Sequence, residues 1–146
     1  MGERGQRVLG VDPGTRVVGY AVVEKKGTAF AVLSCGVIKP RAADPLPDRL
    51  RVIFEGLQEQ IALHRPEVVA VEEVFAGKGP RTSITIGEGR GVALLAAGLA
   101  RLPVAAYAPR TVKKAITGGG ESGKTTVKRM LQLLTGFREG LPLDAT

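Results

Sequence analysis

Residues 8–15, Val-Leu-Gly-Val-Asp-Pro-Gly-Thr, constrain the fold of this chain more than any other stretch. A short apolar run ends on the carboxylate of Asp12. Three residues follow it: Pro13, whose φ is fixed, Gly14, which tolerates a positive φ, and Thr15, which carries a hydroxyl. The pattern predicts a buried strand that carries Asp12 at its C-terminal tip. Because an unpaired carboxylate is costly to bury, we expect Asp12 at the rim of a cleft, where a cation or a hydrogen-bonded turn compensates its charge.

The chain has 146 residues, which is the size of one domain, and a single cysteine, Cys35. One cysteine excludes an intrachain disulfide framework and a multi-cysteine zinc site, and it fits a reducing, cytoplasmic setting in which Cys35 is a small strand residue. The longest strongly apolar stretch, residues 92–100, is far too short to span a bilayer, and the N-terminus lacks an apolar signal core. We therefore expect a soluble protein without a membrane partner.

The net charge of +7 is concentrated in the second half of the chain. Residues 1–75 hold ten Lys/Arg and ten Asp/Glu, whereas residues 76–146 hold eleven Lys/Arg and four Asp/Glu. A solvated basic face is one interpretation. A one-sided excess is more typical of a polyanion partner. The absence of Trp and the presence of only two Tyr argue against a stacking platform for single strands.

The first half of the chain predicts an antiparallel meander followed by a helix. Strands are expected over 17–23 and 29–38 with a turn between them, and residues 40–47 form a loop. Asp48 then opens a helix with apolar residues at helical spacing. The only histidine, His64, falls in the last turn of this helix, where a dipole partner is a better interpretation than a catalyst.

Residues 68–72 repeat the opening pattern, because an unbroken apolar run again ends on an acid, Glu72. Such a run suits a parallel strand that is covered on both faces, and the preceding helix is the crossover that makes it parallel. Beside the first strand, Glu72 and Asp12 would project from neighbouring tips about 4.8 Å apart. Two carboxylates so close repel each other unless a divalent cation lies between them. Glu73 falls on the opposite face and is the poorer ligand candidate.

A Gly-rich loop with an exposed Phe75 comes next, and Thr82 or Ser83 is expected to cap a long helix that runs to Ala100. Small residues crowd the later part of this helix, so it is expected to pack closely against the sheet or a second subunit. A fifth strand over 104–107 completes a right-handed strand-helix-strand unit, and further helices are expected from residue 109 onward.

Residues 118–125 match the nucleotide-binding pattern G-x-x-x-x-G-K-[ST]. A P-loop requires a buried strand directly before it, whereas residues 111–117 carry two lysines in a helix-like segment, so the context argues against nucleotide binding. The loop remains a candidate anion site for a nucleic-acid phosphate. The opening motif also occurs as the phosphate loop of actin-like kinases, but those need two such domains and this chain supplies one.

Three acids form the main constellation: Asp12, Glu72 and, after the last basic helix, Asp144. In the purely structural interpretation, Asp12 caps its own turn and Glu72 pairs with a lysine. Two acids at strand tips that face a basic half-domain favour a metal site instead. Carboxylate clusters with two Mg²⁺ ions clamp the attacking and leaving oxygens of a phosphodiester, and this is the chemistry that the pattern suggests.

The expected order, three strands, helix, strand, helix, strand, helix with acids on the first and fourth strands, resembles the ribonuclease H fold. Successive motifs resemble the RuvC family of Holliday-junction resolvases, the crossover junction endodeoxyribonucleases. They run in order along almost the whole chain and are specific jointly: Leu-Gly-Val-Asp-Pro-Gly-Thr at 9–15, Val-Glu-Glu-Val-Phe at 71–75, Gly-Glu-Gly-Arg-Gly-Val-Ala at 87–93 and Val-Lys-Lys at 112–114.

The resemblance implies an α/β, ribonuclease H-like fold: a five-stranded mixed sheet, three antiparallel strands and then parallel ones, with helices on both faces. It implies a cytoplasmic, bacterial homodimer that binds four-way junction DNA and nicks two opposed strands, leaving 5′-phosphate and 3′-hydroxyl ends. The implied cofactor is Mg²⁺, two ions per active site, with Mn²⁺ as a substitute. A branch-migration helicase complex, RuvAB, is an implied partner.

Residue roles also follow from the resemblance, position by position. Asp12, Glu72 and Asp144 would be the catalytic metal ligands, and Lys113 and Lys124 would be catalytic residues that hold the phosphates of the scissile region. Phe75 would engage unpaired bases at the junction centre. The basic residues assigned to DNA binding are Lys78, Arg81, Arg110, Lys113, Lys114 and Lys124.

The family carries a further catalytic aspartate three positions beyond the one that Asp144 matches, and the printed sequence ends at Thr146. We therefore expect residues 1–146 to form a single nuclease domain that lacks its C-terminal helix and a complete carboxylate set. Three hypotheses follow: a structure-selective endonuclease, a nucleotide-binding protein built on residues 118–125, and a junction-binding module without catalysis.

Overall fold

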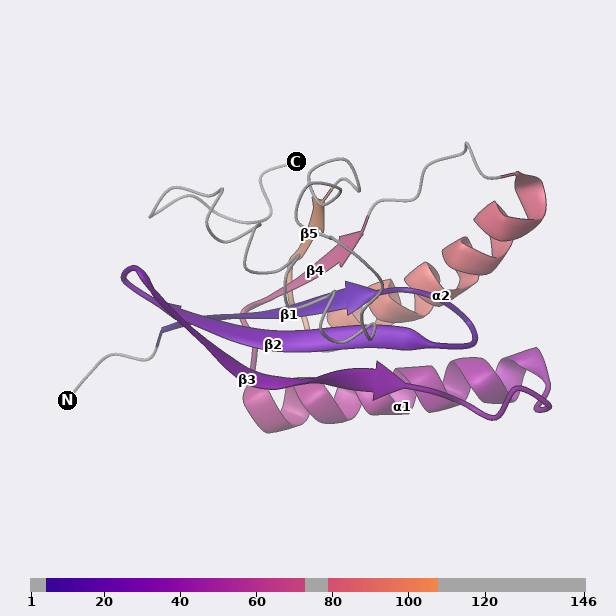
Figure 1. The fold of residues 1–146 in the computed structure, drawn as a ribbon, viewed down its shortest axis with the longest axis horizontal. Helices are drawn as coiled ribbons and strands as arrows, with labels where there is room; N and C mark the ends of the chain where they lie inside the picture. The colour runs from indigo at the N-terminus through magenta and orange to yellow at the C-terminus, as the bar shows by residue number, and fades with distance from the viewer. Residues whose placement is uncertain (1–4, 73–78, 108–146) are drawn as a thin grey trace, which may run out of the picture.

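The computed structural model describes residues 5–72 and 79–107, with the backbone alone at positions 72 and 107. These residues form a five-stranded sheet with the strand order β3-β2-β1-β4-β5 (Figure 1). In chain order the elements are β1 (Gln6–Asp12), β2 (Val18–Lys26), β3 (Ala29–Ile38), α1 (Leu46–His64), β4 (Val68–Glu72), α2 (Pro80–Leu99) and β5 (Val104–Tyr107).

The first three strands form the predicted antiparallel meander. β1 pairs with β2, and β2 pairs with β3 after a turn in which Gly27 has a φ of 58°. A positive φ is easy for glycine because it has no Cβ. The register shifts between Val22 and Val23, which pair with Ser34 and Val32, so Leu33 is an extra residue in β3.

The second half of the sheet is parallel, and the predicted crossover is confirmed. β4 runs parallel to β1, from the pair Val8–Val68 to the pair Val11–Val71, and β5 runs parallel to β4. The predicted strands over 29–38, 68–72 and 104–107 have the bounds that the structure gives them. The mixed ribonuclease H-like sheet expected from the resemblance is therefore confirmed.

Both helices begin earlier than the sequence predicted. α1 begins at Leu46, two residues before Asp48, with Pro47 in its first turn. The prediction that Thr82 or Ser83 caps α2 is wrong, because Gly79 is the N-cap and Pro80 begins the helix. Proline suits this position because its missing N–H is one that a helix start leaves unbonded anyway and its fixed φ is helical.

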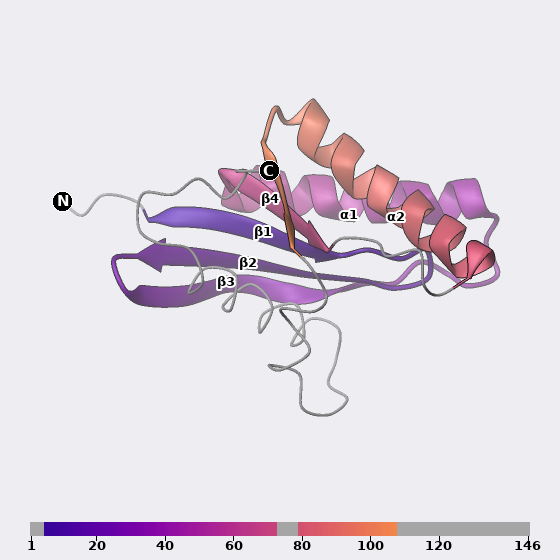
Figure 2. The same ribbon diagram turned by 90° about the horizontal axis from the view of Figure 1, so that it is seen from above.

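The two helices lie on one face of the sheet and contact each other (Figure 2). The core between sheet and helices holds Leu9 and Val11 of β1, Ile53 and Leu57 of α1, and Ala93 of α2, all at most 1% exposed. Burying side chains of this kind is the main favourable term in folding.

The opposite face of the sheet is also apolar and buried. It includes Val8, Ala21, Val23, Ala70 and Ala105, each fully buried. Burial on both faces agrees with the continuous apolar runs in the sequence. Helices on both faces were expected, and the further helices expected from residue 109 onward lie outside the described residues. Neither α1 nor α2 has an apolar stretch that could cross a membrane.

Candidate metal and nucleic-acid site

Asp12 and Glu72 occupy matching positions at the ends of adjacent parallel strands. The pairing of β1 with β4 ends at Val11–Val71, and each acid is the next residue along its strand. On their outer sides, Asp12 pairs with Gly19 of β2 and Glu72 pairs with Tyr107 of β5. Adjacent strands lie about 4.8 Å apart, so the backbone brings both positions to one site, as the sequence predicted.

Strand alternation places positions 12 and 72 on the face of the sheet opposite to α1 and α2. Leu9 and Val11 pack in the core with α1 and α2, so Asp12 shares the opposite face with Val8. Along β4, Val69 and Val71 belong to the same core, which puts position 72 on the face of Asp12. The Asp12 side chain is partly buried. The site therefore faces away from the helical layer that supports the sheet.

The turn after Asp12 is crowded, and crowding explains its glycine. A Cβ on Gly14 would lie 2.6 Å from the carbonyl oxygen of Val17. Gly89 of α2 approaches the same turn so closely that a Cβ there would lie 2.8 Å from the Gly14 nitrogen and nearer still to its carbonyl. Among the described glycines, only Gly27 and Gly79 have a positive φ. Gly14 is therefore needed because the Val17 carbonyl and Gly89 of α2 approach it closely, which the sequence did not reveal.

Thr15 and Arg49 fasten this turn to α1. Thr15 is 4% exposed. Arg49 Nη1 donates to the Thr15 carbonyl oxygen at 3.1 Å and to Oγ1 at 3.4 Å, while Arg49 Nε donates to the Asp44 carbonyl oxygen at 3.1 Å. Sequence reasoning assigned no role to either residue. The one available signal was an arginine in the first turn of an amphipathic helix, beside its apolar stripe.

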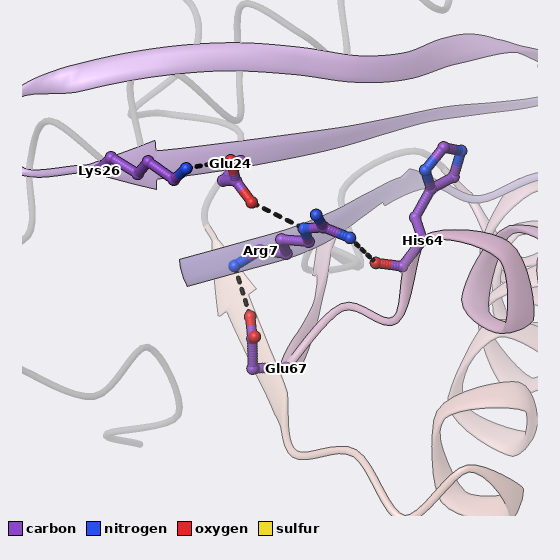
Figure 3. Close-up of polar contacts among 5 residues, drawn as sticks. All are labelled: Arg7, Glu24, Lys26, His64 and Glu67. Carbon is purple, nitrogen blue, oxygen red and sulfur yellow. Dashed lines mark hydrogen bonds and ion pairs between the residues drawn. The ribbon is translucent and has the colours of Figure 1, made fainter. Parts of the chain in front are cut away.

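His64 lies far from the acids. It ends α1 near the start of β1, whereas Asp12 ends β1. In Figure 3 its carbonyl oxygen accepts a hydrogen bond from Arg7 Nη1 at 2.7 Å. Arg7 Nε also lies 2.8 Å from Glu24 Oε2, and the Arg7 backbone N–H donates to Glu67. These contacts of Arg7 join β1, β2 and the end of α1, and His64 takes part in them through its backbone carbonyl.

Of the basic residues assigned to DNA binding, Arg81 is the one that the structure describes. Arg81 is exposed in the first turn of α2, and its backbone carbonyl oxygen accepts a hydrogen bond from Thr85 Oγ1 at 3.0 Å. The remaining site predictions and the Gly-rich anion loop lie outside the described residues: Glu73, Phe75, Lys78, Arg110, Lys113, Lys114, residues 118–125 and Asp144.

The acids at the strand tips offer the donors that a hard divalent cation prefers. Carboxylate oxygens suit Mg²⁺ and Mn²⁺, while sulfur and imidazole suit softer metals. No group of three His, Cys, Asp or Glu side chains that could hold a metal occurs within the described part of the chain. The acids at positions 12 and 72 could thus supply two oxygen ligands to one metal site, and a third side-chain ligand would have to come from outside the described residues.

This sheet, with carboxylate positions at the tips of its first and fourth strands, defines the ribonuclease H-like class. Within that class the chain belongs to the family of the crossover junction endodeoxyribonuclease RuvC, whose model matches residues 8–146.

Curated relatives and a solved structure agree with this assignment. The chain is 44% identical over 132 residues to a crossover junction endodeoxyribonuclease RuvC of Pelotomaculum thermopropionicum, covering 90% of this chain and 80% of that protein. It is 48% identical over 140 residues to the RuvC of Myxococcus xanthus, covering 96% and 70%. The structure of T. thermophilus RuvC in complex with Holliday junction substrate matches with a TM-score of 0.75 and 26% identity, covering 90% of this chain and 97% of that one.

Proposed function

We propose that this protein is a structure-selective endodeoxyribonuclease that resolves four-way DNA junctions in recombination and repair. The observation that carries the proposal is the pair of acids at matching tips of β1 and β4. The structure of T. thermophilus RuvC in complex with Holliday junction substrate supports the substrate class. The excess of Lys and Arg in the second half of the chain supplies the charge that phosphate binding requires.

The proposed site uses Asp12, Glu72 and Asp144 to hold two Mg²⁺ ions, for which Mn²⁺ can substitute. When bound, such ions would activate a water molecule and stabilise the leaving 3′ oxygen, leaving 5′-phosphate and 3′-hydroxyl ends. The carboxylates fix the position of the ions relative to the sheet. Lys113 and Lys124 would neutralise phosphates beside the scissile bond.

DNA contacts divide into two kinds in this proposal. Phe75 would stack on bases that are unpaired at the junction centre. The basic residues would hold the sugar-phosphate backbone and position the junction without reading its sequence. They are Lys78, Arg81, Arg110, Lys113, Lys114 and Lys124.

The outward face of α2 supports a homodimer. Ile84, Leu95 and Leu99 are 64%, 55% and 64% exposed, and a Cβ on Gly87 or Gly91 would meet nothing within 4 Å. Large apolar side chains and open glycines on one exposed helix face suit close helix–helix packing. Two copies paired through α2 would carry two active sites for paired nicks. A branch-migration helicase complex would deliver the junction in the cytoplasm.

The test incubates the full-length protein with a synthetic mobile four-way junction and Mg²⁺. We expect paired nicks in opposed strands and no comparable cleavage of linear duplex. Asp12→Asn should lower cleavage by more than about 100-fold, the scale on which single electrostatic groups act in active sites. Junction affinity should stay the same, because it comes mainly from lysine and arginine contacts to phosphate.

Asp48→Asn is the matched control, since it makes the same chemical change on an exposed residue in the first turn of α1. It should cleave like the wild type. Absence of paired nicking by the wild type, or full activity of Asp12→Asn, would overturn the proposed function. Tight junction binding without nicking under all conditions would instead identify a non-catalytic junction-binding module.

A further inference from the structure

The structure assigns a positioning role to Arg49, which we infer fixes the turn that follows Asp12 from the helical side of the sheet. This inference rests on the proposed nuclease function, because it concerns the acid that would hold the metal. Arg49 lies in the first turn of α1, and α1 covers the face opposite the acids. It is therefore expected to act through Asp12 and not by touching DNA.

The guanidinium of Arg49 bridges two backbone segments. Nη1 donates to the carbonyl oxygen of Thr15 at 3.1 Å and to its Oγ1 at 3.4 Å. Nε donates to the carbonyl oxygen of Asp44, in the loop before α1, at 3.1 Å. The planar fork of arginine can serve both segments at once, whereas a lysine presents a single nitrogen. Thr15 is almost fully buried, so water is a poor replacement for these donors.

The turn transmits this anchor to Asp12 because its backbone has little freedom. Only two residues separate Thr15 from Asp12: Pro13 has a fixed φ, and Gly14 is enclosed between the Val17 carbonyl and Gly89 of α2. Upstream, Asp12 is held by its pairing with Gly19. A shift of Thr15 therefore moves the end of β1 instead of being absorbed within the turn.

This arrangement predicts a specific division of effects when Arg49 is removed. The carboxylate of Asp12 would sample a wider range of positions, so metal affinity and the rate of strand cleavage would fall. Junction binding would not, since the lysines and arginines that face DNA are unchanged. Loss of groups that orient metal ligands typically costs 10–100-fold in metal affinity or activity.

The experiment compares Arg49→Gln with Arg51→Gln in the full-length protein. Arg51 lies on the same helix but is 60% exposed and bonded to Glu55, so its loss is the matched control. Four quantities are measured: single-turnover cleavage at saturating junction, junction affinity in Ca²⁺, Mg²⁺ affinity by calorimetry, and amide hydrogen exchange of residues 14–17. All exchange and binding measurements are made well below the unfolding midpoint of each variant.

For Arg49→Gln we expect cleavage about 10–100-fold slower and Mg²⁺ binding about 10-fold weaker. The amides of residues 14–17 should exchange faster, and junction affinity should change less than about twofold. Arg51→Gln should match the wild type in all four measurements. Cleavage by folded Arg49→Gln within twofold of the wild type would overturn the inference, as would a loss of junction affinity as large as the loss of rate.

Arg49→Lys covers the case in which Arg49→Gln does not fold. Lysine keeps the charge but cannot span Thr15 and Asp44 together, so an intermediate loss of about 3–10-fold in rate and faster exchange in the turn are expected. A folded Arg49→Lys protein with wild-type rate and exchange would overturn the inference. If the wild type itself does not nick junctions, the proposed function fails. The role of Arg49 is tested separately: unchanged Mg²⁺ affinity and unchanged amide hydrogen exchange in the turn after Asp12 in the Arg49 variants would overturn it.

Discussion

Replacing Glu24 by glutamine should destabilise the protein far more than the same replacement of Glu55. Both carboxylates pair with an arginine at nearly the same distance, 2.8 Å from Arg7 to Glu24 and 2.9 Å from Arg51 to Glu55. They differ in environment: the side chains are 25% and 11% exposed in the first pair, and 60% and 57% exposed in the second. Glu24 also has Lys26 Nζ 3.8 Å from its other oxygen, but that lysine is 57% exposed, so burial of the Arg7–Glu24 pair is the main difference.

The magnitudes follow from that difference. An exposed helical pair contributes about 0.3–0.5 kcal/mol, and we expect this for Glu55→Gln. Breaking a fully buried pair costs about 3–5 kcal/mol, and hydrogen bonds to charged groups are worth about 1.5–3 kcal/mol. Arg7 is partly exposed and keeps its bond to the His64 carbonyl, so Glu24→Gln should cost about 2 kcal/mol. A change of 1 kcal/mol shifts the thermal unfolding midpoint by about 2–4 °C in a domain of this size, so Glu24→Gln should lower Tm by about 4–8 °C.

The assay is urea unfolding at low and high salt, with double-mutant cycles that add Arg7→Gln and Arg51→Gln. The coupling energy of the exposed pair should decline as salt shortens the screening length, while that of the Arg7–Glu24 pair should be nearly unchanged. Equal coupling energies for the two pairs would refute the argument that burial sets their contribution. A cost below about 0.5 kcal/mol for Glu24→Gln would refute it as well.

Three further predictions concern the helices and the loop aromatic. Gly89→Gln should lose about 1–3 kcal/mol in denaturation experiments and slow cleavage because it pushes α2 away from the turn that follows β1. Gly87→Gln, which meets nothing within 4 Å in its own chain, should leave the packing of α2 on this turn unchanged and affect only the proposed pairing of two copies. Leu95→Asp should shift the protein from dimer to monomer in sedimentation, and Leu63→Asp, on a leucine of α1 that is 66% exposed against 55% for Leu95, should not; dimers in both would place the interface elsewhere. Phe75→Ala should reduce junction cleavage more than Mg²⁺ binding, and unchanged cleavage would make this ring a packing residue.

The sheet could be predicted from sequence because its signals are local. Val8–Asp12 and Val68–Glu72 are apolar runs of strand length that end on acids, and the amphipathic helix between them dictates a parallel crossover. These three facts are enough to bring Asp12 and Glu72 to adjacent tips. The helix starts were less well predicted, since Pro47 and Pro80 initiate helices through backbone geometry that outweighs the side-chain capping signal of Thr82 or Ser83.

The supports of the site could not be predicted because they join positions that are distant in sequence. Arg49 reaches Thr15 across 34 residues, and Gly89 contacts Gly14 from another helix. No spacing rule links such pairs, and a glycine in a turn suggests positive φ before it suggests crowding. The Arg7–Glu24 pair was missed for the same reason, because each residue alone looks like a charged strand end.

Two strands supply the acid positions, and two helices hold the turn behind one of them from the opposite side of the sheet. Arg49 of α1 and Gly89 of α2 both act on the turn after β1. In the proposed function, this arrangement keeps Arg49 and Gly89 on the side of the sheet opposite to Asp12, where metal and DNA would bind. It also means that the precision of the site depends on residues that would never touch DNA, because a displacement of about 1 Å at a reacting group can cost about 100-fold in rate.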